Sequence, residues 1–295
     1  MPEGDTLFRI ASTLRKALLG RTLIRFESQL PEIREIDSRM PVAGRAIEAV
    51  EPLGKNLLIV LRRLDVADDP TLHESLPKRE PINLDLLRTD LVLHTHLRMT
   101  GSWHIYRPGE RWQKPENYAK VVLHTDAYIA ICFSAPVVEL MTARETQRHP
   151  HLTKLGPDAI SDEFDPLEAR RRLRQYADMP IGVAIMKQSA MAGVGNIYKS
   201  EVLFIRRINP FGLVRELDDA TLDGLIEESH KLLQQNRGRG ERQTRFALNS
   251  SQRLWAYGRL NEPCHVCGTK MLMRRQGLEG RTTYYCPQCQ NTPKF

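Results

Sequence analysis

The alternation of hydrophobic and polar residues changes its period about half-way along the chain. Near the N-terminus, apolar residues recur at helical spacing over residues 6–19, and Gly20 follows as a stop signal. Short strand-like runs come next, at residues 22–26, 46–50, 56–61, 90–96, 103–106, 120–124 and 128–133. Because turn residues separate these runs, the pattern predicts a β-sandwich of two sheets with one flanking helix.

The second half of the chain has a helical period instead. Apolar residues recur at helical spacing in residues 166–176, 181–191, 196–206 and 220–235. Residues 149–158 contain His-Pro and Gly-Pro steps, which are typical of a linker between domains. Residues 67–83 are polar and contain proline, so they predict a surface loop. We therefore expect an α+β multidomain protein with domains at residues 1–148, 149–260 and 261–295.

Composition excludes several classes of protein. The 295 residues are 41% hydrophobic and 27% charged, as in ordinary globular chains. No apolar run approaches the roughly 18 residues of a membrane span. The first residues also lack the basic-then-apolar order of a secretion signal. We therefore expect neither a membrane protein nor a fibrous or wholly disordered one.

The net charge of +7 is unevenly distributed. From Lys231 to the end there are 12 Lys and Arg residues against 3 acidic ones, whereas the preceding part has 31 against 33. A basic segment of this kind suits polyanions, with nucleic acid first and acidic lipid second. A solvated basic tail without a partner is the alternative, and charge alone does not separate the two.

Four of the five cysteines form two closely spaced pairs. They are Cys264-x2-Cys267 and Cys286-x2-Cys289, with 18 residues between the pairs. This spacing predicts two thiolate pairs on tight turns at the ends of a β-hairpin, the arrangement of a structural zinc site. A disulfide framework is the alternative, and it is disfavoured because no export signal is present. Cys132 lies in an apolar run and is expected to be a buried free thiol.

A glycine-rich turn joins two of the helical segments. Residues 192–196 read Ala-Gly-Val-Gly-Asn, and Asn196 is well placed as the N-cap of the next helix. Consecutive N–H groups at such a turn make an anion nest that could hold a phosphate. An ordinary turn between two helices is the alternative.

The N-terminus carries a second candidate for chemistry. Removal of the initiator methionine would leave Pro2 with a free secondary amine beside Glu3. An unperturbed α-amine has a pKa of roughly 7.7–8.0, so a useful fraction is neutral and nucleophilic near neutral pH. Attack by a secondary amine on an aldehyde-like C1′ gives a charged iminium, which draws electrons for elimination, and the adjacent carboxyl can shuttle protons. Retention of Met1 would acylate Pro2 and remove the nucleophile.

Ordered sequence blocks extend over nearly the whole chain. They are Pro2-Glu3-Gly4, Gly54-Lys55, residues 96–102, 149–158 and 193–196, Tyr257-Gly258-Arg259, the four cysteines and residues 280–290. In this order the blocks resemble the formamidopyrimidine-DNA glycosylase/endonuclease VIII family. Each block is modest alone, and the resemblance rests on their joint order.

The resemblance implies a bifunctional base-excision repair enzyme, a DNA glycosylase and AP lyase. Members of this family have an N-terminal β-sandwich, a helix–two-turn–helix domain and a zinc finger, with DNA in the cleft between the lobes. The implied cofactor is one structural Zn²⁺. The implied partner is double-stranded DNA with damaged bases or abasic sites, with single-stranded or bubble DNA as a further substrate. We expect a monomer in the cytoplasm, associated with the nucleoid if the source is bacterial.

The family pattern also suggests roles for residues at matching positions. By resemblance, Pro2 is the Schiff-base nucleophile and Glu3 is the general acid. Lys55 matches the lysine that assists β-elimination, and Arg281 matches the arginine of δ-elimination and phosphate binding. Because all four are present, the sequence favours an enzyme over a catalytically silent DNA-binding protein on the same scaffold.

Further positions match the DNA contacts of the family. Lys154 and Asn196 match phosphate contacts. Arg98, Met99 and Thr100 match the wedge that fills the hole left by an extruded base. Met99 is unbranched and apolar, which suits a wedge, although a position in the core is the alternative.

Two departures from the family pattern bear on the substrate. Members specialised for 8-oxoguanine carry an Arg-Arg-Phe-Gly strip after the strand that here ends at Phe133, whereas residues 134–139 read Ser-Ala-Pro-Val-Val-Glu. Asp5 also replaces a proline that is common in the family. Both departures favour the endonuclease VIII side and predict a preference for oxidised pyrimidines.

Overall fold

The computed structural model describes residues 2–64, 90–238, 240–246 and 252–292. The surface loop expected at residues 67–83 lies outside the described residues. The chain forms two compact units. The N-terminal unit consists of Pro2 and Leu7–Thr153, and the C-terminal unit consists of Glu3–Thr6 and Lys154–Phe295. The expected domain limits at residues 148 and 260 stay a prediction.

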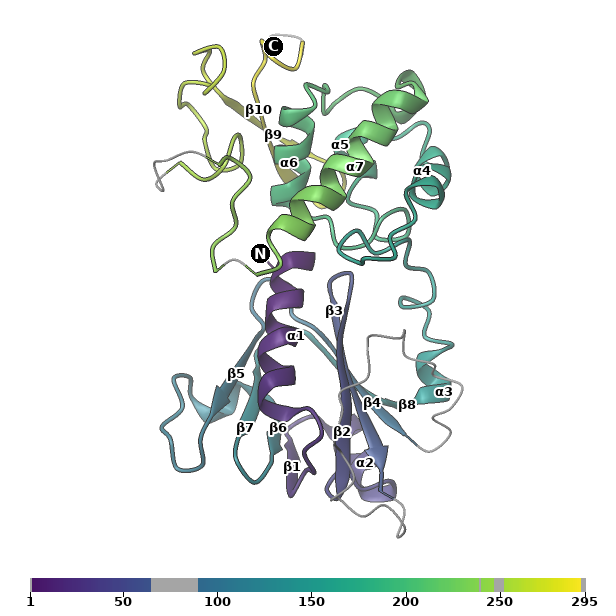
Figure 1. The fold of residues 1–295 in the computed structure, drawn as a ribbon, viewed down its shortest axis with the longest axis vertical. Coiled ribbons are helices and arrows are strands. Elements are labelled where there is room, and N and C mark those ends of the chain that lie inside the picture. Colours follow the sequence, from purple (N-terminus) through teal and green to yellow (C-terminus); the bar gives the residue numbers. More distant parts are fainter. Residues whose placement is uncertain (1, 65–89, 239, 247–251, 293–295) are drawn as a thin grey trace. The chain divides into compact units, whose positions relative to one another are not determined.

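Two four-stranded antiparallel sheets and one helix form most of the N-terminal unit, as the sequence pattern predicts (Figure 1). The first sheet has the order β1–β6–β7–β5, with β1 (Arg25–Ser28), β6 (Ala119–His124), β7 (Ile129–Phe133) and β5 (Ser102–Tyr106). The second has the order β2–β3–β4–β8, with β2 (Arg45–Leu53), β3 (Asn56–Arg63), β4 (Leu91–His96) and β8 (Val137–Thr142). The helix is α1 (Gly4–Leu18).

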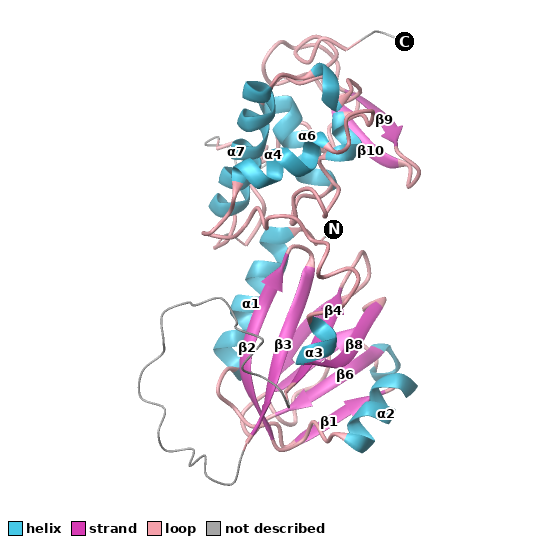
Figure 2. Ribbon diagram, turned by 90° about the vertical axis from the view of Figure 1, so that its right-hand side faces the viewer, coloured by secondary structure: helices cyan, strands magenta, loops and turns pink. Residues whose placement is uncertain are grey.

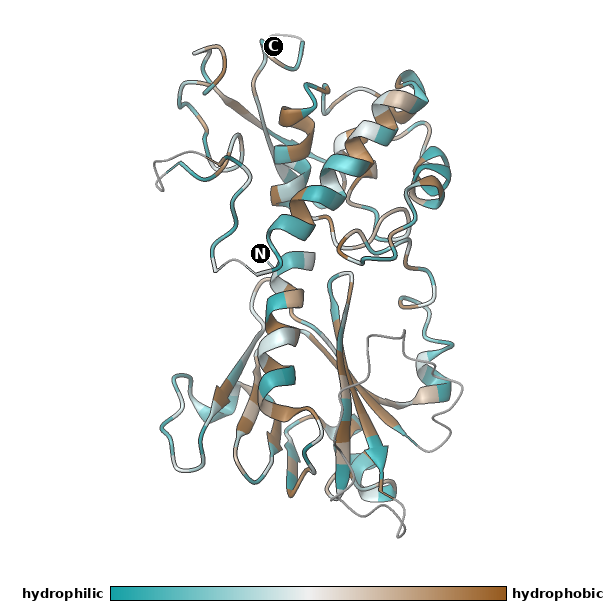
Figure 3. Ribbon diagram, viewed as in Figure 1, coloured by the Kyte–Doolittle hydropathy of each residue, from teal (hydrophilic) through white to brown (hydrophobic). Residues whose placement is uncertain are grey.

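The core of this unit lies between the two sheets and α1. Leu7, Ala11 and Leu14 of α1 are buried at intervals of three and four residues, as one face of a helix requires. They share one apolar cluster with residues of both sheets, and Figure 3 shows brown, hydrophobic positions along the strands that line it. Cys132 belongs to this cluster, and burial raises the pKa of its thiol. It is the buried free thiol that the sequence predicts.

Four elements of the N-terminal unit escape the sequence pattern. They are α2 (Pro31–Arg39), the 3-10 turn η3 (Glu116–Tyr118), strand β8 and the short α3 (Ala143–Thr146). Only Ile33 of α2 is buried, so its apolar stripe is too narrow to stand out. In β8, Glu139 interrupts the apolar run.

The C-terminal unit is helical and ends in a hairpin. Its elements are α4 (Pro166–Arg174), α5 (Ile181–Ala184), α6 (Asn196–Ile205), η4 (Val214–Glu216), α7 (Asp219–Gln235), β9 (Leu272–Gln276) and β10 (Arg281–Tyr285). Figure 2 shows the β9–β10 hairpin beside α6, and β10 contacts that helix. Among the described residues, no helix is long and apolar enough to cross a membrane.

The helix expected at residues 181–191 is wrong in length, because α5 ends at Ala184. The residues that follow bind an extended segment instead of continuing the helix. Gly156 donates its N–H to the carbonyl of Gln188 at 2.8 Å, and Ala192 donates to the carbonyl of Pro157 at 2.9 Å. These pairings use backbone groups that a longer α5 would need.

Candidate active site

The turn before α6 is the centre of a buried cluster in the C-terminal unit. Gly193 has a φ of +94°, a conformation that glycine adopts without strain, and Gly195 is the N-cap of α6. The expectation that Asn196 caps this helix is wrong. Asn196 is the first helical residue, and its side-chain amide donates to Thr282 Oγ1 at 3.0 Å.

The carboxylate of Glu3 takes the place of a side-chain cap. It accepts the N–H groups of Gly195 at 3.0 Å, Ile197 at 2.8 Å and Tyr198 at 3.3 Å, and Glu3 is fully buried. The first N–H groups of a helix have no partner within it and favour negative charge. The turn is therefore an anion nest, as predicted, but its anion is the Glu3 carboxylate and not a phosphate.

Asp5 extends this cluster by a buried ion pair with Arg242. Arg242 Nε donates to Asp5 Oδ2 at 3.0 Å, and its Nη2 contacts Asp5 Oδ1. The Arg242 guanidinium also lies over the ring of Tyr198, 4.8 Å from its centroid. Burial lowers the pKa of Arg242, but the charges of Glu3 and Asp5 outweigh it and raise the pKa overall. The sequence marked Asp5 as unusual but did not indicate its partner.

Lys199 is a buried residue of the site that sequence reasoning missed. Its Nζ donates to Asn196 Oδ1 at 2.7 Å, to the carbonyl of Thr282 at 2.9 Å and to Thr283 Oγ1 at 2.8 Å. Two of these hydrogen bonds join α6 to β10, and the third holds the side chain of Asn196 on α6 itself. Burial lowers the pKa of Lys199 to about 7, with Glu3 acting in the opposite direction. The signal in the sequence that could have identified it is a lysine within the largely apolar helix α6.

Arg281 lies at the start of β10, close enough for its charge to help lower the pKa of Lys199. Its Nη2 and Nε lie 2.7 and 2.8 Å from Glu279 Oε2, and the side chain is 39% exposed. The structure thus brings Glu3, Asn196 and Arg281 together around Lys199. Lys154, by contrast, is an exposed turn residue.

Glu201 fixes a further segment of this unit. Its carboxylate accepts the N–H groups of Trp255 at 2.7 Å, Ala256 at 2.8 Å and Tyr257 at 2.7 Å, and the hydroxyl of Thr244. Burial raises the pKa of Glu201, and these hydrogen bonds oppose the shift. Glu201 therefore joins Thr244 to residues 255–257.

The other predicted site residues belong to the N-terminal unit. Lys55 and Gly54 form the turn between β2 and β3, and Gly54 has a φ of +59°. Burial and, to a smaller extent, the nearby charge of Lys55 lower the pKa of His96 to about 4. Pro2 is half-buried and groups with this unit.

The proposed wedge residues form an exposed turn after β4. Arg98 has a φ of +46°, and Met99 is 63% exposed. The alternative that Met99 is a core residue is therefore wrong. Thr100 Oγ1 donates to the carbonyl of Ser134 at 3.0 Å, which ties the turn to the end of β7. The turn presents an unbranched apolar side chain to solvent.

The four paired cysteines converge as the sequence predicts. Their sulfur atoms lie within 4.8 Å of one another, with 3.8 Å between Cys264 and Cys289 and 3.5 Å between Cys267 and Cys286. A disulfide requires about 2.05 Å, whereas a tetrahedral zinc–thiolate site separates its sulfurs by about 3.8 Å. The donor set therefore fits a metal ion and not two disulfides.

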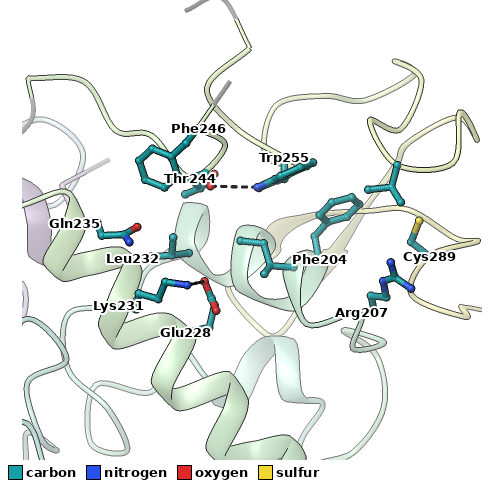
Figure 4. A pocket seen from close by; sticks show the side chains of 12 residues that line it. Phe204, Arg207, Glu228, Lys231, Leu232, Gln235, Thr244, Phe246, Trp255 and Cys289 are labelled. Carbon is teal, nitrogen blue, oxygen red and sulfur yellow. Dashed lines mark hydrogen bonds and ion pairs between the residues drawn. The ribbon is translucent and has the colours of Figure 1, made fainter. Parts of the chain in front are cut away.

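A separate hollow of the C-terminal unit lies along α6 and α7. It has a volume of about 300 Å³, and Figure 4 shows Phe204, Phe246 and Trp255 on its walls with the Lys231–Glu228 pair. Phe204 follows Ile197 by seven residues along α6, a distance of about 10 Å. The hollow is thus separate from the N–H groups that bind Glu3.

Two family models match the chain. The model described as the formamidopyrimidine-DNA glycosylase N-terminal domain matches residues 1–136. The model described as the formamidopyrimidine-DNA glycosylase H2TH domain matches residues 155–247. The expected helix–two-turn–helix domain is confirmed by the second match.

Relatives match over nearly their whole length. "Probable endonuclease 8 2" of Streptomyces coelicolor is 34% identical and is matched over 99% of this chain and 95% of its own. "DNA-(apurinic or apyrimidinic site) lyase Nei2" of Mycolicibacterium smegmatis is 32% identical, over 98% of this chain and 99% of its own. "Endonuclease 8" of Escherichia coli is 28% identical, over 99% of this chain and 100% of its own.

Solved structures of Lactococcus lactis Fpg (MutM) have the same fold. The complex with N7-benzyl-Fapy-dG containing DNA has a TM-score of 0.75 at 22% identity, over 98% of this chain and 99% of that one. The complex non-covalently bound to DNA containing an AP site has a TM-score of 0.74 at the same identity and coverage. At this identity the likeness shows the fold alone.

Proposed function

The chain belongs to the formamidopyrimidine-DNA glycosylase/endonuclease VIII family, on its endonuclease VIII side, and on this premise we propose that Pro2 and Glu3 carry its chemistry. It is a DNA glycosylase and AP lyase of DNA repair, with DNA as its partner. We propose in addition that it removes oxidised pyrimidines, that it forms a Schiff base through its N-terminal proline, and that it cleaves the strand by β,δ-elimination.

The proposed reaction begins at the amine of Pro2. Its lone pair forms a bond to C1′ as the bond from C1′ to the base breaks, and the base leaves with the bonding pair and takes up a proton. The Glu3 carboxylate takes up the proton that the Pro2 nitrogen loses and then, as general acid, donates it to the ring oxygen, so that the sugar opens to the iminium. Loss of a C2′ proton then expels the 3′ phosphate, assisted by Lys55. Loss of the C4′ proton in a second elimination, assisted by Arg281, then expels the 5′ phosphate.

One observation carries this proposal. The Glu3 carboxylate, next to Pro2 in the chain, is held by three backbone N–H groups at the start of α6. Backbone donors leave this group little freedom of position, which is what proton transfer at a reacting centre needs. A carboxylate with a merely structural role would not need to adjoin a potential N-terminal nucleophile.

A metal ion has an indirect role in this proposal. Cys264, Cys267, Cys286 and Cys289 would hold one Zn²⁺, which supplies structural cross-linking and no reacting group. The ion would stabilise the hairpin whose strand β10 carries Arg281 and the Lys199 contacts. The hairpin is thereby preorganised for a phosphate.

The DNA contacts are proposed from the exposed or basic residues of both units. Lys154 and Arg281 would bind phosphates, and Asn196 would do so by exchanging its bond to Thr282 for a phosphate oxygen. Arg98, Met99 and Thr100 would enter the base stack from their exposed turn. We further propose a monomer that acts on duplex, bubble and single-stranded DNA in a bacterial cytoplasm, at the nucleoid.

Borohydride trapping on an abasic-site duplex tests the nucleophile. Protein whose N-terminus is verified as Pro2 by mass spectrometry should form a covalent adduct at that residue. Pro2→Gly should weaken trapping strongly, while Glu3→Gln should abolish base release and spare some cleavage at abasic sites. No adduct with correctly processed protein would instead favour a catalytically silent DNA-binding protein. Base release by Glu3→Gln at the parent rate would overturn the role of Glu3.

A further inference from the structure

A second cluster of metal-binding residue types lies in the N-terminal unit, apart from the cysteines. His94 of β4 and Glu139 of β8 are directly opposite each other in the sheet, and His149 follows α3. His94 Nδ1 lies 2.8 Å from Glu139 Oε2, and His149 Nε2 lies 3.1 Å from the same oxygen. One ligand atom of each residue thus lies within 4.8 Å of the others.

The hydrogen bonds of the two His94 ring nitrogens show that the contact between Nδ1 and Glu139 needs a further proton or a cation. Asn56 Nδ2 donates to the carbonyl of Leu53 at 3.1 Å, so Asn56 Oδ1 is the atom that faces His94 Nε2 at 2.9 Å. Nε2 must therefore carry the proton of a neutral ring, and Nδ1 carries a lone pair. In a neutral ring that lone pair faces a carboxylate oxygen at 2.8 Å, so the contact needs a second ring proton or a cation between the two atoms.

A second ring proton or a bound cation would resolve this contact. The His94 side chain is only 3% exposed, and burial disfavours a charged ring. A metal ion needs no charge on the ring, because it takes the Nδ1 lone pair as a ligand. Metal-binding histidines also commonly donate their other N–H to an oxygen of a neighbouring side chain, as His94 does to Asn56.

We propose that His94, Glu139 and His149 bind a divalent transition-metal ion such as Zn²⁺. Two imidazoles and one carboxylate suit this class of ion, whereas Mg²⁺ and Ca²⁺ prefer oxygen ligands alone. The fourth ligand is water or His151, whose ring centroid lies 5.8 Å from that of His149.

Small movements would open the site to an ion. Ligand atoms bound at about 2.0–2.1 Å in a tetrahedron lie about 3.3–3.4 Å apart, so the carboxylate must withdraw slightly from both rings. Glu139 is 44% exposed and has room to rotate. His149 must carry its proton on Nδ1, which gives up the contact to the N–H of Leu152. At 3.3 Å, this is the longest hydrogen bond of the cluster.

The ion would act as a clamp on the end of the N-terminal unit. His149 lies in the segment that leaves α3, and this unit ends at Thr153. His94 and Glu139 lie on two paired strands of the second sheet. A shared ion would therefore bind the leaving segment to that sheet and stabilise the unit against unfolding.

Metal stoichiometry tests the clamp directly. Full-length protein whose cysteine site has been saturated with one equivalent of Zn²⁺ is titrated with Co²⁺ and followed by absorption spectroscopy and calorimetry. We expect one further equivalent to bind with visible bands of a nitrogen and oxygen ligand set, without the intense thiolate bands that cobalt at cysteines would show. If no second equivalent binds to the wild-type protein, the proposal is overturned.

Variants assign the second equivalent to these residues. His149→Asn and Glu139→Gln, both at partly exposed positions, should each lose it and lose the rise in melting temperature that the ion causes. His124→Asn is the matched control, because His124 of β6 pairs with Glu27 at 2.7 Å, and among the described residues this pair belongs to no cluster that could hold a metal ion. Binding that survives in both site variants, or is lost equally in the control, would contradict the assignment. None of these results depends on glycosylase activity.

Discussion

The carboxylate of Glu3 accepts the backbone N–H of Gly195 at 3.0 Å, and this contact leaves no room for a side chain at position 195. A Cβ built on Gly195 would lie 2.4 Å from Glu3 Cδ. Gly195 is thus the N-cap of α6 and also packs directly against the side chain of Glu3, the proposed general acid. The absence of a side chain at position 195 therefore allows Glu3 to take its present position.

Gly195→Ala should displace Glu3 from the start of α6. Because the new methyl group occupies the space of the carboxyl group, we expect base release to fall by at least about tenfold, as positional errors near 1 Å cause such losses. The measurement is the single-turnover excision rate. Gly238→Ala is the control, because a Cβ there would meet no atom within 4 Å. Equal rates in the two variants would show that Glu3 does not need its present position.

Lys199 should make DNA binding depend on pH. Its pKa is lowered to about 7, so the free protein carries the ammonium below pH 7 and loses it above. Phosphate near Arg281 would favour the charged form, so binding above pH 7 requires proton uptake. The Kd for an abasic-analogue duplex should stay constant below pH 7 and rise up to tenfold per pH unit above it. Lys199→Met should flatten this dependence, whereas Lys231→Met should keep it.

The same shift has a consequence for stability. Between about pH 7 and the usual lysine pKa of 10.5, the unfolded chain binds more protons at Lys199 than the folded one does. The free energy of unfolding should therefore rise with pH across this window as far as Lys199 contributes. Chemical denaturation of the wild type and Lys199→Met at pH 7 and pH 9 measures the contribution. If the free energy of unfolding rose less between pH 7 and pH 9 in the wild type than in Lys199→Met, the lowered pKa of Lys199 would be contradicted.

Strict periodicity explains which elements the sequence predicts. Helix α1 and strand β3 have regular apolar positions that face one core, and both are predicted. Strand β8 escapes because Glu139 interrupts its apolar run, and α5 is overestimated because residues after Ala184 pair with a distant extended segment. Local pattern carries no information on such pairings.

The site divides in the same way. Cysteine spacing predicts the metal cluster because the two cysteines of each pair are only three residues apart in the sequence. The binding of Glu3 to Gly195 joins positions 192 residues apart, and Lys199 acquires its partners from β10, 83 and 84 residues away. Residue types identify candidates, but only the fold decides which backbone groups meet them.

Loss of one cysteine should affect the hairpin and not the sandwich. Cys286→Ser should release the metal and unfold the hairpin that carries Arg281, because such sites fold on binding metal. DNA affinity and strand nicking should fall together, while the β-sandwich keeps its circular-dichroism signal. Cys132→Ala is the cysteine control and should retain metal, since Cys132 lies in the core of the N-terminal unit. Active wild-type protein without zinc would contradict the metal assignment.

Arg281 should contribute about one phosphate contact to DNA binding. The logarithm of affinity falls with the logarithm of salt concentration by about 0.9 per phosphate neutralised, so Arg281→Ala should reduce the slope by about one unit. Arg171→Ala should leave it unchanged, because Arg171 lies on α4 and pairs with Glu168. Glu279→Gln should increase affinity, since Glu279 is the group that Arg281 must leave. A wild-type slope near zero would point to an uncharged partner.

A prediction of substrate preference follows from the turn that Thr100 contacts. Specialists for 8-oxoguanine carry arginine and phenylalanine after the strand that here ends at Phe133. In this protein the next residue, Ser134, has a φ of +49° and accepts the hydroxyl of Thr100, and residues 135–136 are alanine and proline. Within this turn no arginine or aromatic side chain is available to probe the base opposite a lesion. Met99 would then fill the stack from one side, without regard to the opposite base.

We therefore expect oxidised pyrimidines such as thymine glycol and 5-hydroxyuracil to be released faster than 8-oxoguanine, from duplex and bubble DNA alike. Strand cleavage should leave phosphates on both sides of a one-nucleotide gap, because Lys55 and Arg281 are both present. Single-turnover rates on matched duplexes measure the preference, and an abasic-site duplex controls for the lyase step. Met99→Ala should slow base release but spare cleavage at abasic sites, since those need no extruded base. Faster release of 8-oxoguanine opposite cytosine than of every oxidised pyrimidine would overturn the preference while leaving the glycosylase activity intact.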